Sequence, residues 1–182
     1  GATPLFLAAE QNNLPIVRAL CARGVEINLG TFEGFSPLHA AAREGHASVA
    51  RFLIGAKADL TKTDSSGYSP MMLAAGQGHA KIVRLLAEAG VRVDVATKIF
   101  KSDADQGGET ALHRACEKGH AEMVGLLLDM DKSGSMINSV TGQGRTSLIT
   151  AAEEGQQECV QILLEKGANV HITTKAGKGA LY

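Results

Sequence analysis

The chain has 182 residues and a formal net charge of −1, so it lacks the positive field that would attract nucleic acid or an anionic membrane. Aromatic residues are only 4% and Trp is absent, whereas glycine occurs 21 times, which favours short, closely packed helices joined by turns. The three cysteines are widely spaced, which excludes a disulfide framework and a Cys-x-x-Cys metal site and indicates a reducing compartment. No apolar run of membrane-spanning length and no signal-peptide pattern is present.

A helix-start signal recurs along the chain. A Thr or Ser followed by a small residue or Pro and then an apolar residue predicts a helix N-cap, with Pro tolerated at the first helical position. Its starting points are separated by 33, 33, 41, 36 and 33 residues, the last being a remnant: Thr3, Ser36, Ser69, Thr110, Thr146 and Gly179. Each full signal from Ser36 onward is followed nine residues later by a glycine that predicts a left-handed turn between two helices, Gly45, Gly78, Gly119 and Gly155. A second, apolar helix follows each turn.

Three departures from this pattern predict local changes. Lys57 stands where a glycine should end the second helix, so we expect strain or a changed turn there. Asp131 holds that place in the fourth repeat and precedes an insertion of three residues, 132–134. A longer insertion, within 95–105, predicts an extended finger or loop.

The caps, glycines and apolar helices in one register resemble the ankyrin-repeat family over residues 1–182. The resemblance implies an all-α solenoid of stacked antiparallel helix pairs with projecting β-hairpin loops. The expected repeats lie at about 1–28, 29–61, 62–94, 95–138 and 139–171, with a partial repeat at 172–182. Because the last repeat is unfinished, we expect the chain to be a fragment of a longer protein.

No residue pattern indicates catalysis, a metal or a cofactor. Five of the six histidines recur at repeat positions, His39 and His113 in the Thr/Ser-x-Leu-His motif, rather than at metal-ligand spacing. The cysteines occupy packing positions, and Glu153 and Glu154 are adjacent on a helix and diverge too far for a general acid and base. The sequence therefore predicts a protein that is not an enzyme.

In the ankyrin-repeat family the loops and the exposed side of the first helices form a concave binding face. The residues that its register places there are Phe32, Glu33, Phe35, Arg43, Glu44, Tyr68, Gln77, Glu109, Glu117, Lys118, Arg145, Glu153 and Glu154. Phe35 and Tyr68 hold the same position in adjacent repeats, which predicts an aromatic patch, although loop-to-loop packing is the alternative. The glutamates predict an acidic stretch in repeats four and five, with a solvated charged face as the alternative.

These features predict a protein-protein interaction module that binds a partner segment bearing an apolar anchor near repeats two and three and basic residues towards repeat five. The alternative is a structural spacer or assembly domain of a larger channel, receptor or enzyme. The expected partner is a protein or peptide, not nucleic acid or a membrane. We expect a monomer in the cytoplasm, with the nucleus as an alternative. The resemblance also implies that Asn28 is a candidate for asparaginyl hydroxylation, and Asn138 a weaker one, with a turn-stabilising role as the alternative.

Overall fold

The computed structural model describes residues 1–97 and 107–180, which contain ten helices in consecutive pairs. The chain divides into two compact units, unit 1 (Gly1–Val91) and unit 2 (Arg92–Tyr182). The helices of unit 1 are α1 (Pro4–Glu10), α2 (Leu14–Ala22), α3 (Pro37–Glu44), α4 (Ala47–Gly55), α5 (Pro70–Gly76) and α6 (Ala80–Glu88). Those of unit 2 are α7 (Ala111–Glu117), α8 (Ala121–Met130), α9 (Ser147–Glu153) and α10 (Gln157–Glu165). The predicted all-α repeat fold is confirmed.

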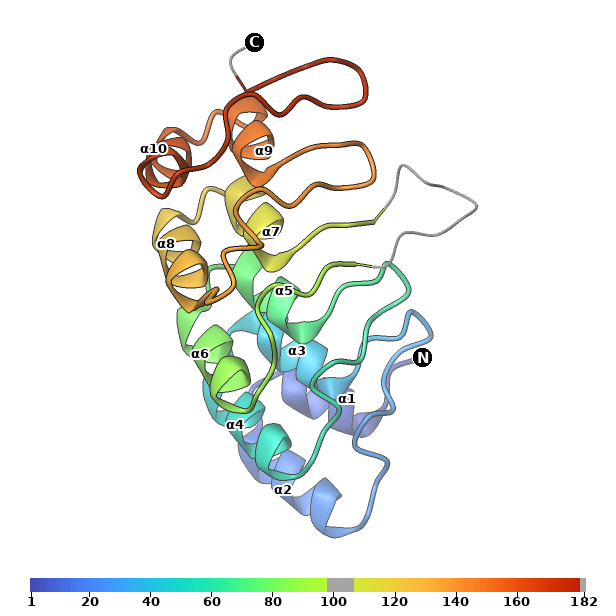
Figure 1. The fold of residues 1–182 in the computed structure, drawn as a ribbon. Helices are drawn as coiled ribbons and strands as arrows, with labels where there is room; N and C mark the ends of the chain where they lie inside the picture. The colour runs from blue at the N-terminus through green and yellow to red at the C-terminus, as the bar shows by residue number, and fades with distance from the viewer. Residues whose placement is uncertain (98–106, 181–182) are drawn as a thin grey trace. The chain divides into compact units, whose positions relative to one another are not determined.

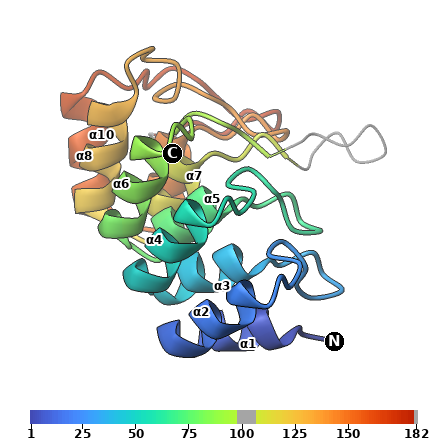
Figure 2. The ribbon, with the colours of Figure 1, turned by 90° about the horizontal axis from the view of Figure 1, so that it is seen from below.

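Within each unit the helices form two stacked columns. In unit 1 the first helices α1, α3 and α5 pack against one another, and the second helices α2, α4 and α6 form the other column. In unit 2, α7 packs on α9 and α8 packs on α10. The long loops project from the side of the first helices in both units (Figures 1 and 2). The first helices and the loops therefore share one surface within each unit.

Every first helix begins at its predicted cap. The side-chain oxygens of Thr3, Ser36, Ser69, Thr110 and Thr146 each accept a backbone N–H from the first turn of the helix. The prolines of the first three repeats occupy the start of the helix, where no backbone hydrogen bond is lost. Each cap stabilises its short helix by about 1 kcal/mol, which matters because helices of seven or eight residues are marginal alone.

Small side chains set the packing distance between the first helices. Ala41, Ala42, Ala74 and Ala75 are fully buried in unit 1, and Ala115 is fully buried in unit 2. The second helices supply larger side chains, with fully buried Leu53 and Leu86 in unit 1 and Leu127 and Leu163 in unit 2. Burying a leucine side chain stabilises the fold by about 2 kcal/mol, so the apolar core lies between the two columns.

The turns after the second helices are altered at the two places where the sequence departs from the repeat pattern. Lys57 has a φ of 66°, so the predicted strain is confirmed: a residue with a Cβ occupies the left-handed conformation that glycine takes in other repeats. Asp131 replaces that turn with side-chain hydrogen bonds, because its carboxylate accepts the backbone N–H of Ser133 at 3.1 Å and of Met136 at 2.7 Å. Met136 is buried, so the three-residue insertion is anchored on its far side.

The projecting loops are closed by turns rather than by extended ladders. In the described part of the chain, only isolated bridges occur in them, Val140 with Thr146 and Thr173 with Gly179. Most of the longer insertion, including Phe100, lies outside the described residues. Its base is closed, because the Thr97 N–H donates to the Glu109 carbonyl at 2.7 Å and the Gly108 N–H donates to the Thr97 carbonyl at 3.0 Å.

Candidate functional site

The last residue of each loop, immediately before Ser36, Ser69, Thr110, Thr146 or the remnant position Gly179, is called the exit position. The exit positions are Phe35 and Tyr68 in unit 1, and Glu109, Arg145 and Lys178 in unit 2. The first four side chains are half-buried and Lys178 is exposed. The first four exit side chains start at the junction of a loop and a first helix, where the ankyrin-repeat family presents its binding face.

In unit 1, Phe35 forms the centre of a small cluster. Its ring meets the His39 ring edge-on at 5.7 Å between centroids, and the Arg43 guanidinium lies 5.6 Å from the Phe35 centroid. Arg43 also pairs with Glu10 at 3.0 Å and with Glu44 at 2.8 Å. The cluster therefore offers an aromatic ring, a cation and two carboxylates on one side of α1 and α3.

The loop before α3 carries a second ring. Phe32 is 94% exposed, and the neighbouring Glu33 is also exposed. Tyr68 is connected to the Phe35 cluster through the backbone, because the His39 ring shares a hydrogen bond of 3.1 Å with the Tyr68 carbonyl. Gln77 is the exposed C-cap of α5. The predicted residues of repeats two and three thus belong to the loops and first helices of unit 1, but their role as a binding patch stays a prediction.

In unit 2, two glutamates of the predicted acidic stretch, Glu117 and Glu153, are paired with bases of the same unit. Glu117 pairs with Arg114 at 2.5 Å and with Lys118 at 2.8 Å, and Glu153 pairs with Arg145 at 2.5 Å. Burial raises the pKa of Glu117, but Lys118 and Arg114 outweigh that effect and leave its pKa below the usual value. Sequence register placed these residues on one face, but it could not show that the carboxylates are paired.

Two buried histidines connect consecutive loops. The Ser36 N–H donates to His39 Nδ1 at 3.0 Å, so the neutral ring carries its proton on Nε2 and donates it to the Tyr68 carbonyl. His113 repeats this arrangement in unit 2, between Thr110 and the Arg145 carbonyl at 3.1 Å. Burial lowers the pKa of both rings. Both histidines are structural, as their position in the motif predicted, and the described residues hold no cluster of three or more potential metal ligands.

The loop asparagines also join neighbouring repeats. The Asn28 side-chain oxygen accepts the Asp59 N–H at 2.8 Å in unit 1, and Asn138 accepts the Asn169 N–H at the same distance in unit 2. The insertion before Asn138 has therefore not disturbed its role. The turn-stabilising alternative is supported at both positions, and hydroxylation of Asn28 stays a prediction.

The cysteines are not equally buried. Cys116 and Cys159 are buried as predicted, but Cys21, in the last turn of α2, is only half-buried. The neighbouring Cys159 thiol and burial both raise the pKa of Cys116, which keeps that thiol protonated near neutral pH. Within the described residues, no helix has the length and apolar character needed to cross a membrane.

Sequence reasoning missed the glycine that precedes each exit position. Gly34, Gly108 and Gly144 have φ angles of 82°, 74° and 80°. A Cβ on Gly34 would lie 3.2 Å from the Asp64 Cα, one on Gly108 would lie 2.9 Å from the Val140 carbonyl oxygen, and one on Gly144 would lie 3.1 Å from the Lys175 nitrogen. The signal was available, because glycine recurs at 34, 67, 108, 144 and 177. These glycines let the backbone of each loop approach the next.

Comparison with known proteins agrees with this repeat architecture. The family profile described as ankyrin repeats in three copies matches residues 1–64, 57–133 and 92–174. The chain is 33% identical over 93 residues to the E3 ubiquitin-protein ligase KEG of Arabidopsis thaliana, which covers 51% of this chain and 6% of the relative. It is 37% identical over 93 residues to the B-cell lymphoma 3 protein homolog of Mus musculus, covering 50% of this chain and 21% of the relative.

A third relative is the nuclear factor NF-kappa-B p105 subunit of Rattus norvegicus, 33% identical over 67 residues, which are 37% of this chain and 7% of that protein. The chain thus spans about a fifth or less of the length of these relatives. The family profile covers nearly the whole chain, and the helix pairs, caps and turns repeat in step with it. This chain therefore belongs to the ankyrin-repeat family.

Proposed function

We propose that the chain is a non-catalytic protein-protein interaction module, and that unit 1 binds a partner segment on the loop side of α3 and α5. Ankyrin repeats are generally protein-interaction modules. The observation that supports this location is the Phe32 ring, which is 94% exposed on the loop that ends at the aromatic exit position Phe35.

An exposed phenylalanine contributes little to folding and much to binding. Burying such a side chain against a partner stabilises the complex by about 2 kcal/mol, and aromatic anchors are enriched among the residues that dominate interface energies. Arg43, already placed over Phe35, would contribute a cation and a guanidinium donor to the same surface. We infer a partner segment with an apolar side chain that packs on Phe32 and Phe35.

The test compares variants of the loop side with one of the other helix column. We expect Phe32→Ala, and the double variant Phe35→Ala with Tyr68→Ala, to weaken retention of partners from a cell extract at least several-fold. Phe52→Ala on α4 is the matched control, because Phe52 lies under Arg18 on the second-helix column. Quantitative mass spectrometry of retained proteins measures the effect. Equal retention by all variants would contradict the proposal.

Phe32→Ala is the sharper variant, because Phe35 also packs on buried His39 and its loss affects folding. Circular dichroism and the unfolding midpoint of Phe32→Ala should match those of the original chain. If partner retention falls while folding is unchanged, the loss is due to the missing surface side chain and not to destabilisation of the fold.

A structural spacer or assembly role is the second candidate. It is favoured by the length of the relatives, of which the matched regions are 6% and 21% in the first two. In that case the array would hold other parts of a larger protein, and the three aromatic substitutions would leave the retained proteins unchanged. The ligase activity named for one relative is proposed for neither case, because the match covers so little of that protein. We place the chain inside the cell, in the cytoplasm or the nucleus.

A further inference from the structure

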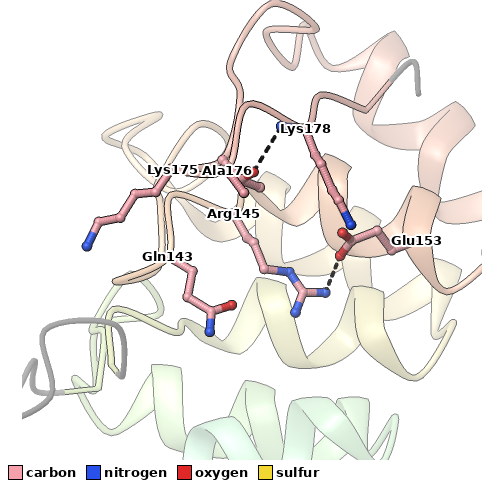
Figure 3. Close-up of a pocket in the computed structure, with 7 residues that line it drawn as sticks. Gln143, Arg145, Glu153, Lys175, Ala176 and Lys178 are labelled. Atoms are coloured by element: carbon pink, nitrogen blue, oxygen red, sulfur yellow. Dashed lines mark hydrogen bonds and ion pairs between the residues drawn. The ribbon is translucent and has the colours of Figure 1, made fainter.

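A pocket of about 320 Å³, lined mainly by residues with polar or charged side chains, lies in unit 2 between the loops that end at Arg145 and Lys178. Its lining includes Gln143, Arg145, Glu153, Thr174, Lys175 and Lys178 (Figure 3). Arg145 and Lys178 are consecutive exit positions, and Glu153 lies seven residues after the cap of its helix, as Arg43 does in unit 1. The pocket is therefore built from the repeat positions at which unit 1 carries Phe35, Arg43 and Tyr68.

The backbone fixes the walls of this pocket. The Lys175 N–H donates to the Gln143 carbonyl at 3.0 Å and joins the two loops. The second loop is closed on itself, because the Thr174 N–H donates to the Lys178 carbonyl at 2.8 Å and the Lys178 N–H donates to Thr174 Oγ1 at 3.1 Å. A ligand would meet an ordered site and would lose less affinity to loop ordering.

The charges in the pocket do not balance. Two cationic residues, Arg145 and Lys178, face one carboxylate, Glu153, and Lys175 is a further lining residue. Arg145 binds that carboxylate at 2.5 Å, and Lys178 points toward it while Lys175 extends to the opposite side (Figure 3). Glu153 is thus already paired with Arg145, and the lining keeps an excess of positive charge. This excess would repel an incoming cation.

We propose that this pocket binds the carboxylate of an Asp or Glu side chain in the partner segment. The inference rests on the proposed function, since it assigns a chemical preference to the end of the same repeat surface. A carboxylate there would accept from the Lys178 ammonium, and it would complete the charge balance around Glu153. This preference replaces the basic partner residues that the glutamates of the sequence suggested for repeat five.

The probe is a short acetylated peptide of alternating Gly and Glu, titrated into the isotope-labelled chain and followed by amide chemical shifts. We expect weak binding that shifts the amides of Gln143, Thr174 and Lys178 and that declines at least five-fold between low and high salt. The same peptide with Gln in place of Glu should leave these amides unmoved. Binding of a phosphoserine version without binding of the Glu version would overturn the carboxylate assignment.

Charge reversal locates the effect. Lys178→Glu should abolish the shifts. Lys178→Gln should weaken binding at least three-fold, and because it adds no negative charge it does not introduce the repulsion toward Glu153 that Lys178→Glu does. Lys132→Glu is the matched control, because Lys132 is an exposed lysine of unit 2 outside the pocket and changes the net charge equally. Equal losses in Lys178→Glu and Lys132→Glu, or no shifts at pocket residues, would refute the proposal. Phe32→Ala separates the two proposals: it should reduce partner retention while leaving the peptide titration unchanged.

Discussion

In unit 1 the exit positions are the aromatic residues Phe35 and Tyr68, whereas in unit 2 they are the charged residues Glu109, Arg145 and Lys178. The side chains of the first helices that contact the exit residues also differ between the units. Phe35 lies under the Arg43 guanidinium, and Arg145 is paired with Glu153. The same positions of the repeat thus present a ring and a cation in one unit and a network of charges in the other.

The backbone around these positions is nevertheless the same. His39 bonds to the carbonyl of Tyr68, and His113 bonds to the carbonyl of Arg145, both at 3.1 Å. Loop-to-loop hydrogen bonds also recur, such as Ser65 N–H to the Glu33 carbonyl at 2.8 Å and Gly142 N–H to the Gly107 carbonyl at 2.9 Å. The fold uses the carbonyl of an exit residue and leaves its side chain to vary. The binding chemistry can therefore change between repeats without changing the frame.

Substitution of the glycines that precede the exit positions has the largest expected effect on the backbone arrangement that the two units share. We expect Gly108→Ala in unit 2 to lower the free energy of unfolding by roughly 3 kcal/mol, from left-handed strain and a backbone contact at 2.9 Å. Gly34→Ala in unit 1, with its nearest contact at 3.2 Å, should cost roughly 2 kcal/mol. Urea denaturation measures both.

Matched controls separate strain from contact. Gly24 in unit 1 and Gly167 in unit 2 also have positive φ angles, but a Cβ on either would meet nothing within 4 Å. Their alanine variants should lose only about 1 kcal/mol. If all four variants lost the same amount, the close approach of the loops would not be part of the frame.

The histidine bridges come next in expected effect. His39→Met leaves the buried Ser36 N–H without its partner and removes one of the hydrogen bonds to the Tyr68 carbonyl, which also accepts the Asp64 N–H, so we expect a loss of about 2 kcal/mol. The repeat that follows already holds Met72 at the same position, buried to 1% exposure, so the side-chain volume is tolerated. His113→Met should cost a similar amount in unit 2.

Exposed His171 provides the control, since His171→Gln should leave the unfolding midpoint in urea unchanged. A large difference between His39→Met and His113→Met would show that the two units do not rely on the bridge equally.

The sequence alone predicts this frame well and the surface chemistry poorly. Caps such as Ser36 and turn glycines such as Gly45 act within a few residues, so their roles follow from local stereochemistry. Even the strain at Lys57 follows from the register. The pairing of Glu153 with Arg145 and the position of Arg43 over Phe35 depend on side-chain directions that only packing decides. The half-buried state of Cys21 was missed for the same reason.

Lys57 offers a smaller, stabilising effect that is specific to unit 1. Lys57→Gly relieves the left-handed strain at a φ of 66°, and we expect a gain of about 0.5–1 kcal/mol after the added freedom of the unfolded chain is counted. Ala56→Gly is the control, because Ala56 has a φ of −81° and gains nothing from glycine. A thermal melt of each variant measures the change. A lower Tm for Lys57→Gly would show that the turn is not strained.

The smallest expected effect is a dependence of stability on pH through the same histidines. Burial lowers the pKa of His39 and His113 in the folded state, below the value of 6.5 that applies to an exposed ring. Between those values the unfolded chain binds more protons than the folded chain, so stability rises with pH there. The stability that depends on the two neutral rings is fully present above about pH 6.5, and it is lost as the pH falls through their lower pKa in the folded state.

Urea denaturation at pH values from about 7 down to about 5 should therefore show a falling free energy of unfolding. The double variant His39→Met with His113→Met should be less stable at neutral pH but flatter over this range, because it lacks the two rings that must stay neutral. Since one histidine lies in each unit, the two single variants should each remove part of the slope. A slope that survives unchanged in the double variant would assign it to other groups and break the equivalence of the two bridges.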